Sequence, residues 1–183
     1  MPNYTREGKL LDPMTDEDFK NGMETGKFLK PKHRAFCVLL YYSAVRKQEA
    51  LRTVKEQFQL TRSAVFFDVK KRLKRGKITP PLKLPLKAPF MEELKEAIEQ
   101  TKPGEKVFPY CDKTGYNIVR RVFHYPHFFR LNRITQFFLD GWSIAEVKSW
   151  TGLTLSALNF YVGQVDISRM GDSLAKKKGE VKL

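Results

Sequence analysis

Cysteine and histidine are scarce in this 183-residue chain, which has two cysteines and three histidines. Cys37 and Cys111 lie far apart and neither belongs to a Cys-x-x-Cys pair. This usage predicts a reduced, intracellular protein without a cysteine zinc site. The histidines lack the spacing and acidic neighbours of a metal site, and they are His33, His124 and His127. We therefore expect neither a metal nor another cofactor.

Long apolar runs are also missing. The longest, Ala35 to Val45, is far shorter than the ~20 residues that span a bilayer. The first ten residues contain no apolar signal core. These absences predict a cytoplasmic protein with no membrane partner, whether nucleoid-associated or encoded by a virus or plasmid.

Acidic residues are few beside the basic ones, with 20 Asp and Glu against 34 Lys and Arg, which gives a net charge of +14. Such an excess favours a polyanionic partner, most often nucleic acid. Hydrophobic residues make up 42% and aromatic residues 13% of the chain, so a packed core is expected and global disorder is excluded. The length suits one domain.

Helical periodicity dominates the sequence, so we predict a mainly α fold with a small antiparallel β-hairpin. An apolar helix is expected over 34–45, with Arg46 at its end. The other predicted helices cover 15–26, 48–56, 90–101, 114–123, 127–140, 144–151 and 154–161. Capping boxes are expected at Thr15 and Ser143, and Gly141 should follow the helix that begins at His127.

The β-hairpin is predicted from a change of period. Residues 64–69 are rich in strand formers, and the prolines within 78–86 restrict that segment to a short or edge strand. The tip would lie near Arg75 and Gly76, after a strongly basic stretch. Further basic residues in 27–34 and in the last residues of the chain are expected to follow a DNA backbone.

Four features, taken in order, resemble the catalytic domain of the tyrosine recombinase (phage integrase) family. They are Arg46 in VRKQEAL, the basic hairpin, the sequence His127-Phe-Phe-Arg130, and Tyr161 in LNFYV. The resemblance implies a catalytic domain over 14–165, preceded by a flexible arm (1–13) and followed by a basic tail (166–183).

The resemblance implies a site-specific DNA recombinase or integrase that cleaves and rejoins strands through a 3′-phosphotyrosyl intermediate, without metal or ATP. Tyr161 would be the nucleophile, Arg46 and Arg130 would stabilise the transition state, and His127 would assist. Glu49 would orient the Arg46 guanidinium. A hairpin lysine would protonate the leaving oxygen, and we predict Lys74, with Lys71 and Lys77 as alternatives because a one-residue change of register reverses the strand face. The family implies double-stranded DNA as partner and four protomers on two duplexes.

Two departures from the family pattern keep other interpretations open. The family usually has a histidine or tryptophan shortly after the glycine equivalent to Gly152, where this chain has Leu153, or Gly152 if the alignment is counted back from Tyr161. Typical members also carry a further helical domain that clamps the DNA. A degenerate, binding-only homologue is one alternative. Another is a sequence-specific DNA-binding regulator, because residues 143–162 resemble a helix-turn-helix.

Overall fold

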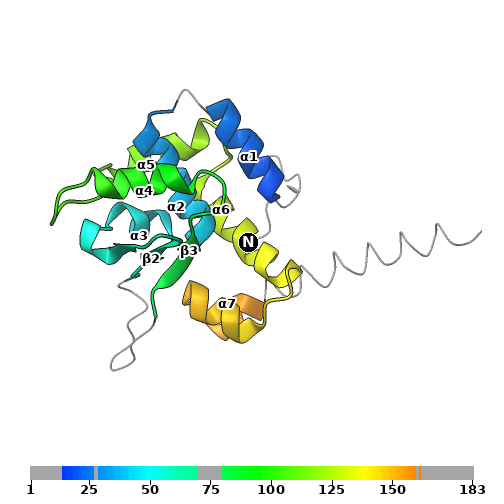
Figure 1. Ribbon diagram of the computed structural model, residues 1–183. Coiled ribbons are helices and arrows are strands. Elements are labelled where there is room, and N and C mark those ends of the chain that lie inside the picture. Colours follow the sequence, from blue (N-terminus) through cyan, green and yellow to red (C-terminus); the bar gives the residue numbers. More distant parts are fainter. Residues whose placement is uncertain (1–13, 27–28, 70–79, 160, 162–183) are drawn as a thin grey trace, which may run out of the picture. The chain divides into compact units, whose positions relative to one another are not determined.

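The computed structural model describes residues 14–26, 29–69, 80–159 and 161. Within these ranges the chain is mainly helical and has one three-stranded antiparallel sheet (Figure 1), which confirms the predicted fold class. The chain divides into two compact units, Met1–Arg133 and Ile134–Leu183, and each is described by itself. None of the described helices is long and apolar enough to cross a membrane.

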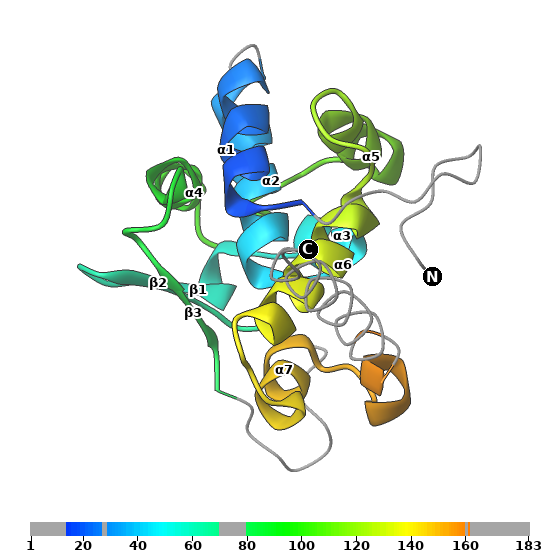
Figure 2. The ribbon, with the colours of Figure 1, turned by 90° about the vertical axis from the view of Figure 1, so that its right-hand side faces the viewer.

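Helix α2 (Pro31–Ser43) is the central element of the first unit. Every residue from 35 to 43 is buried, as expected for a helix that is apolar on all sides. Figures 1 and 2 show it surrounded by other elements of this unit. It contacts α3 (Lys47–Leu51), α4 (Met91–Glu99), α5 (Asp112–Arg120) and β3 (Leu82–Pro85).

The end of α2 differs from the prediction. The helix stops at Ser43, and Ala44 adopts a left-handed conformation with φ of 53°. The Ser43 hydroxyl donates to the carbonyl of Leu39 (2.5 Å) and accepts from the N–H of Val45 (3.3 Å), so a side chain competes with the next helical bonds. Arg46 therefore lies at the N-cap of α3, and the prediction that it ends the apolar helix is wrong.

The sheet has the order β1-β2-β3, with β1 at Phe58–Leu60 and β2 at Ala64–Phe67. Antiparallel pairing of β2 with β3 confirms the hairpin, whereas its predicted tip lies outside the described residues. Strand β1 was not predicted from the sequence. A helix was expected over 48–56, but α3 ends at Leu51, and the short 3-10 helix Lys55–Gln57 leads into β1. Stacked rings of Phe58 and Phe67, 4.6 Å apart, join β1 to β2.

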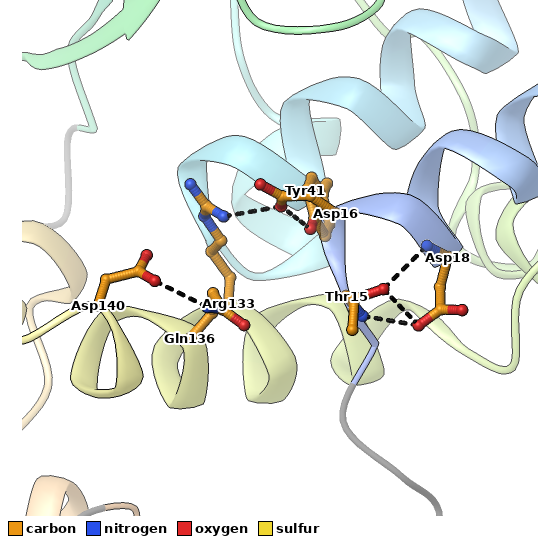
Figure 3. Close-up of polar contacts among 7 residues, drawn as sticks. All are labelled: Thr15, Asp16, Asp18, Tyr41, Arg133, Gln136 and Asp140. Carbon is orange, nitrogen blue, oxygen red and sulfur yellow. Dashed lines mark hydrogen bonds and ion pairs between the residues drawn. The ribbon is translucent and has the colours of Figure 1, made fainter.

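Helix α1 (Asp16–Thr25) begins with the predicted capping box between Thr15 and Asp18 (Figure 3). Its first residue, Asp16, accepts hydrogen bonds from the Tyr41 hydroxyl and from Nη1 of Arg133 (3.2 Å). Tyr41 belongs to α2 and Arg133 to α6 (Pro126–Leu139). One carboxylate thus ties three helices together. Burial and then the Asp16 hydrogen bond raise the pKa of Tyr41.

The second unit contains the end of α6, helix α7 (Ile144–Thr151) and a further helical segment at 155–159 and 161. Gly141 follows α6 with φ of 87°, as predicted. Ser143 and Glu146 form the predicted capping box, and Gly152 ends α7 in the left-handed conformation. Helix α7 and the helical residues 155–159 are thus joined by a tight turn at Gly152.

The two cysteines occupy opposite environments. Cys37 is buried within α2, and burial raises the pKa of its thiol to about 12. Cys111 is exposed at the N-cap of α5, where a hydrogen bond with Thr114 lowers the pKa of its thiol. Cys37 is therefore part of the core.

Arg34 of α2 links three helices of the first unit. Its Nε and Nη2 donate to the Glu93 carboxylate of α4 at 2.8 to 3.0 Å, and its Nη1 donates to the carbonyl of Met23 in α1. The Arg34 side chain is 13% exposed. The prediction that Arg34 follows a DNA backbone is therefore wrong, because its fork already holds an internal carboxylate.

We expect Arg34→Met to lower the free energy of unfolding by about 1–3 kcal/mol, because it leaves the largely enclosed Glu93 charge without its partner. The matched control is Lys95→Met, which removes the exposed pair of Lys95 with Glu92 (3.0 Å). That change should cost clearly less, because an exposed ion pair contributes little to stability. Urea unfolding measures both, and equal losses would show that Arg34 contributes no more than a surface ion pair.

Candidate active site

Arg46 lies at the N-terminal boundary of α3, directly after the Ala44 turn and Val45. Its backbone N–H donates to Oε2 of Glu49 (2.8 Å), and its guanidinium Nη1 donates to Oε1 of the same carboxylate (3.1 Å). Glu49 orients the guanidinium, as the sequence predicted. The Arg46 side chain is 53% exposed, so the rest of its fork can contact a ligand.

His127 and Arg130 lie in the first turns of α6, which begins at Pro126 because proline suits the first helical position. Their spacing of three residues puts both side chains on one helix face. Arg130 is 2% exposed, and its Nη1 donates to the carbonyl of Ala44. Arg130 therefore contacts the turn that presents Arg46.

Arg46, His127 and Arg130 line one pocket in the first unit, with a volume of about 270 Å³. Two segments far apart in the chain thus bring together three of the five residues that the sequence proposed for catalysis. The remaining lining residues are Val45, Lys47, Gln48, Tyr116, Tyr125 and Pro126. Sequence reasoning missed Lys47, Tyr116 and Tyr125, because no motif connects the start of α3 with α5 and the residue that precedes α6.

The donors of this pocket suit an anion. Arginine and lysine side chains donate hydrogen bonds and accept none. Among the described residues, the lining includes Arg46, Lys47 and Arg130 but no aspartate or glutamate. Within the part of the chain that the structure describes, no three His, Cys, Asp or Glu side chains form a group that could hold a metal ion.

His127 has an unusually acidic imidazolium. The residue is exposed, yet partial desolvation lowers its pKa, and the positive charges of Arg130 and Arg46 lower it further. A pKa below the usual value of about 6.5 leaves the imidazole neutral at pH 7. His127 can therefore accept a proton there.

Lys47 and Gln48 connect α3 to α5. Lys47 Nζ forms an ion pair with Oδ2 of Asp112 (2.7 Å), and Gln48 Nε2 donates to Oδ1 of the same carboxylate. Lys47 Nζ also lies 5.6 Å from the centroid of the Tyr116 ring. One carboxylate at the start of α5 thus fixes two side chains of the pocket wall.

The remaining two predicted catalytic residues lie elsewhere. Lys74 and its alternatives, Lys71 and Lys77, fall outside the described residues. Tyr161 belongs to the second unit, where it is helical and 7% exposed. The structure therefore groups Arg46, His127 and Arg130 and does not test the roles of Lys74 and Tyr161.

Trp150 and Leu153 lie close to Gly152, where the family pattern has a histidine or tryptophan. Trp150 packs on Phe137 and Trp142, with ring centroids 5.7 and 5.5 Å apart. Leu153 is partly exposed, and its N–H donates to the hydroxyl of Thr151 (3.3 Å). Trp150 thus has a packing role within the second unit.

Solved structures with a similar backbone are recombinases. The XerA recombinase matches with a TM-score of 0.63 at 14% identity, over 86% of this chain and 60% of that one. The fold is that of the Xer recombinase catalytic domain. The XerH site-specific recombinase bound to its difH substrate before cleavage matches with a TM-score of 0.60 at 18% identity, over 85% and 51% of the two chains. Its post-cleavage complex on palindromic difH gives 0.61 at 17%, over 96% and 56%.

The Xer-like fold is shared without close sequence similarity. No protein-family model matches the chain, and no curated protein sequence matches it. This chain spans about half to three fifths of the length of the Xer recombinases that it resembles. The likeness therefore concerns the backbone, and the chemistry must be argued from the pocket itself.

We expect the His127 imidazole to titrate below pH 6.5, and Arg46→Gln to raise its pKa by removing a neighbouring positive charge. Lys113→Gln is the control, because it removes an exposed positive charge of α5 that does not contribute to the shift. NMR titration of the ring signals, assigned with His127→Gln, measures all three. A pKa at or above 6.5, or no response to Arg46→Gln, would contradict the described electrostatics.

Proposed function

We propose that this chain cleaves and rejoins DNA strands at specific sites, as tyrosine recombinases do, through a 3′-phosphotyrosyl intermediate. The observation that supports it best is the meeting of Arg46, His127 and Arg130 at one pocket. The Xer-like fold is consistent with it, since XerH is seen with its DNA substrate. Integration, excision and resolution of mobile or replicating DNA all use this chemistry.

The cations of the pocket match what phosphodiester cleavage needs. Negative charge grows on the non-bridging oxygens in the transition state, and fixed donors stabilise it most effectively. Arginine forks match phosphate in shape and stay protonated. Arg46, held by Glu49, and Arg130, held by the Ala44 carbonyl, are two such donors.

Tyr161 is the proposed nucleophile. Its phenolic oxygen forms a bond to phosphorus while the bond from phosphorus to the 5′-oxygen breaks. A tyrosine pKa near 10 makes the phenol a weak nucleophile at neutral pH, so neutral His127 takes its proton. In the reverse step the 5′-hydroxyl attacks the phosphotyrosine and Tyr161 leaves. Bond energy is conserved, and the cycle needs no ATP.

Duplex DNA is the proposed partner, and four protomers on two duplexes are the proposed assembly. Exposed cations of the first unit support the DNA partner. Burial, followed by the positive charges of Arg121 and Lys30, lowers the pKa of His33, so both cations lie near His33. Both residues are exposed. A cluster of this kind contacts phosphates without reading sequence.

A DNA-binding regulator without catalysis is the second candidate. The observation that favours it is the geometry of 143–159, where α7, the Gly152 turn and the helical residues 155–159 follow one another as in a helix-turn-helix. The regulator does not need Tyr161 as a nucleophile, so a covalent adduct separates the two functions.

We expect the protein to form a covalent adduct with a nicked duplex that contains its target site, and Tyr161→Phe to abolish it. The adduct survives denaturing electrophoresis because it is an ester of the tyrosine oxygen. Tyr110→Phe is the matched control, since Tyr110 is half-buried, packs on His33 and Phe36, and does not line the pocket.

The pH dependence of the adduct follows from His127. Protonation of the imidazole removes the base, so cleavage should fall as the pH drops through the lowered pKa of His127. An adduct that persists in Tyr161→Phe would remove Tyr161 from the mechanism. Specific, salt-sensitive binding with no adduct on the cognate site would favour the regulator.

We expect Lys74→Ala to slow cleavage by about 10²–10⁴-fold if Lys74 is the general acid. Sulfur in place of the bridging 5′-oxygen should restore the rate, because a thiolate, with a conjugate-acid pKa near 8.5, leaves without a proton. The same assay on Lys71→Ala and Lys77→Ala identifies the correct register. Rescue of another variant would move the role to that lysine, and rescue of none would exclude a hairpin lysine.

A further inference from the structure

The pocket with Arg46, His127 and Arg130 has a second wall of different chemistry, made by Lys47, Tyr116, Tyr125 and Pro126. The volume of the whole pocket, about 270 Å³, approaches the lower end of the range of about 300–1,000 Å³ that is typical of small-molecule sites. A single phosphate group would leave part of this space unfilled. The second wall can therefore hold another part of the same ligand.

The positive charge of this second wall is already neutralised. Lys47 is 17% exposed and its ammonium is paired with Asp112 at 2.7 Å. Gln48 is engaged by the same carboxylate. A second phosphate would gain little from a paired lysine, whereas the Arg46 fork keeps an exposed face. Charge therefore assigns the phosphate to the wall with Arg46 and Arg130, the arginine wall. It assigns an uncharged group to the second wall, with Tyr116 and Tyr125, which we call the tyrosine wall.

The tyrosine wall offers aromatic surface to that uncharged group. Burial raises the pKa of Tyr125, and the neighbouring Tyr116 raises it further, so the two phenols lie near each other. Tyr125 packs on Phe128, with ring centroids 5.7 Å apart, which fixes its ring. Both tyrosines are partly exposed. Aromatic side chains of this kind stack with nucleic-acid bases whatever their sequence.

We propose that Tyr116 and Tyr125 form a nucleoside subsite, which holds the deoxyribose and base next to the phosphate bound by Arg46 and Arg130. This inference rests on the proposed function, since it takes a DNA phosphate as the group at the arginine wall. The subsite positions one nucleotide and fixes the orientation of the phosphate. It contributes stacking, which tolerates every base, and so adds little sequence specificity.

The test uses the full-length protein with three small probes: inorganic phosphate, thymidine 3′-monophosphate and thymidine 5′-monophosphate. The His127 ring signals report occupation of the pocket during NMR titration. We expect one of the two nucleotides to bind about tenfold more tightly than phosphate, equivalent to about 1.4 kcal/mol. The preferred isomer shows on which side of the phosphate the nucleoside lies.

Substitutions distinguish what each wall of the pocket contributes to binding. Tyr116→Leu and Tyr125→Leu should bind inorganic phosphate as the wild type does and lose the preference for the nucleotide, whereas Tyr125→Phe keeps its ring and the preference. If Tyr125→Leu fails to fold, Tyr116→Leu decides, because Tyr116 is partly exposed on α5. Arg46→Gln should weaken all three probes together.

Failure of the subsite differs from failure of the proposed function. Phosphate and both nucleotides binding equally, or a preference that survives Tyr116→Leu and Tyr125→Leu, would overturn the subsite and leave the phosphate site intact. Absence of binding by all three probes would overturn the phosphate site and the subsite with it. An adduct lost in Tyr161→Phe would still support strand cleavage in either case.

Discussion

The hydrogen bond from Arg130 to the carbonyl of Ala44 is the contact on which the candidate site depends. A left-handed conformation costs a residue with a Cβ roughly 1–2 kcal/mol, and a buried guanidinium is unfavourable without an acceptor. The bond offsets both costs at once. It also joins α6 to the turn that follows α2, and Arg46 and Arg130 line the same pocket.

The basic residues of this chain differ in what they contact. Arg34 stabilises the helices around α2 through Glu93, and Lys47 joins α3 to α5 through Asp112. Arg130 contacts the carbonyl of Ala44 and also lines the pocket. Only part of the net charge of +14 is therefore free to attract a polyanion. Counting Lys and Arg favours a polyanionic partner, but it overestimates the number of side chains that are free to contact one.

Local rules predicted the parts of the fold that depend on neighbouring residues. The capping boxes at Thr15 and Ser143 and the glycine that follows α6, Gly141, were all predicted from short sequences. The spacing of His127 and Arg130 likewise follows from helical geometry. The end of α2 was not predicted from the sequence. The Ser43 hydroxyl competes for backbone hydrogen bonds within a segment whose pattern is otherwise helical. Strand β1 was missed because it is formed by pairing with β2.

The same distinction applies to the site. The motif around Arg46 and the His127 to Arg130 spacing were visible because each lies within a few residues. Tyr116 reaches the pocket through the packing of α3 against α5, and Tyr125 directly precedes α6. Sequence spacing does not encode either position. Tyr161 and Lys74 were proposed from the family resemblance, and their roles remain predictions.

The contrast between Cys37 and Cys111 has a practical consequence for studying the pocket. A thiol with a pKa raised to about 12 hardly reacts at neutral pH, whereas the exposed thiol with a lowered pKa does. A maleimide dye should therefore attach at Cys111 in the unaltered sequence. That position adjoins Asp112, which holds Lys47 and Gln48. The chain thus carries its own attachment point for a fluorescent reporter of pocket occupancy.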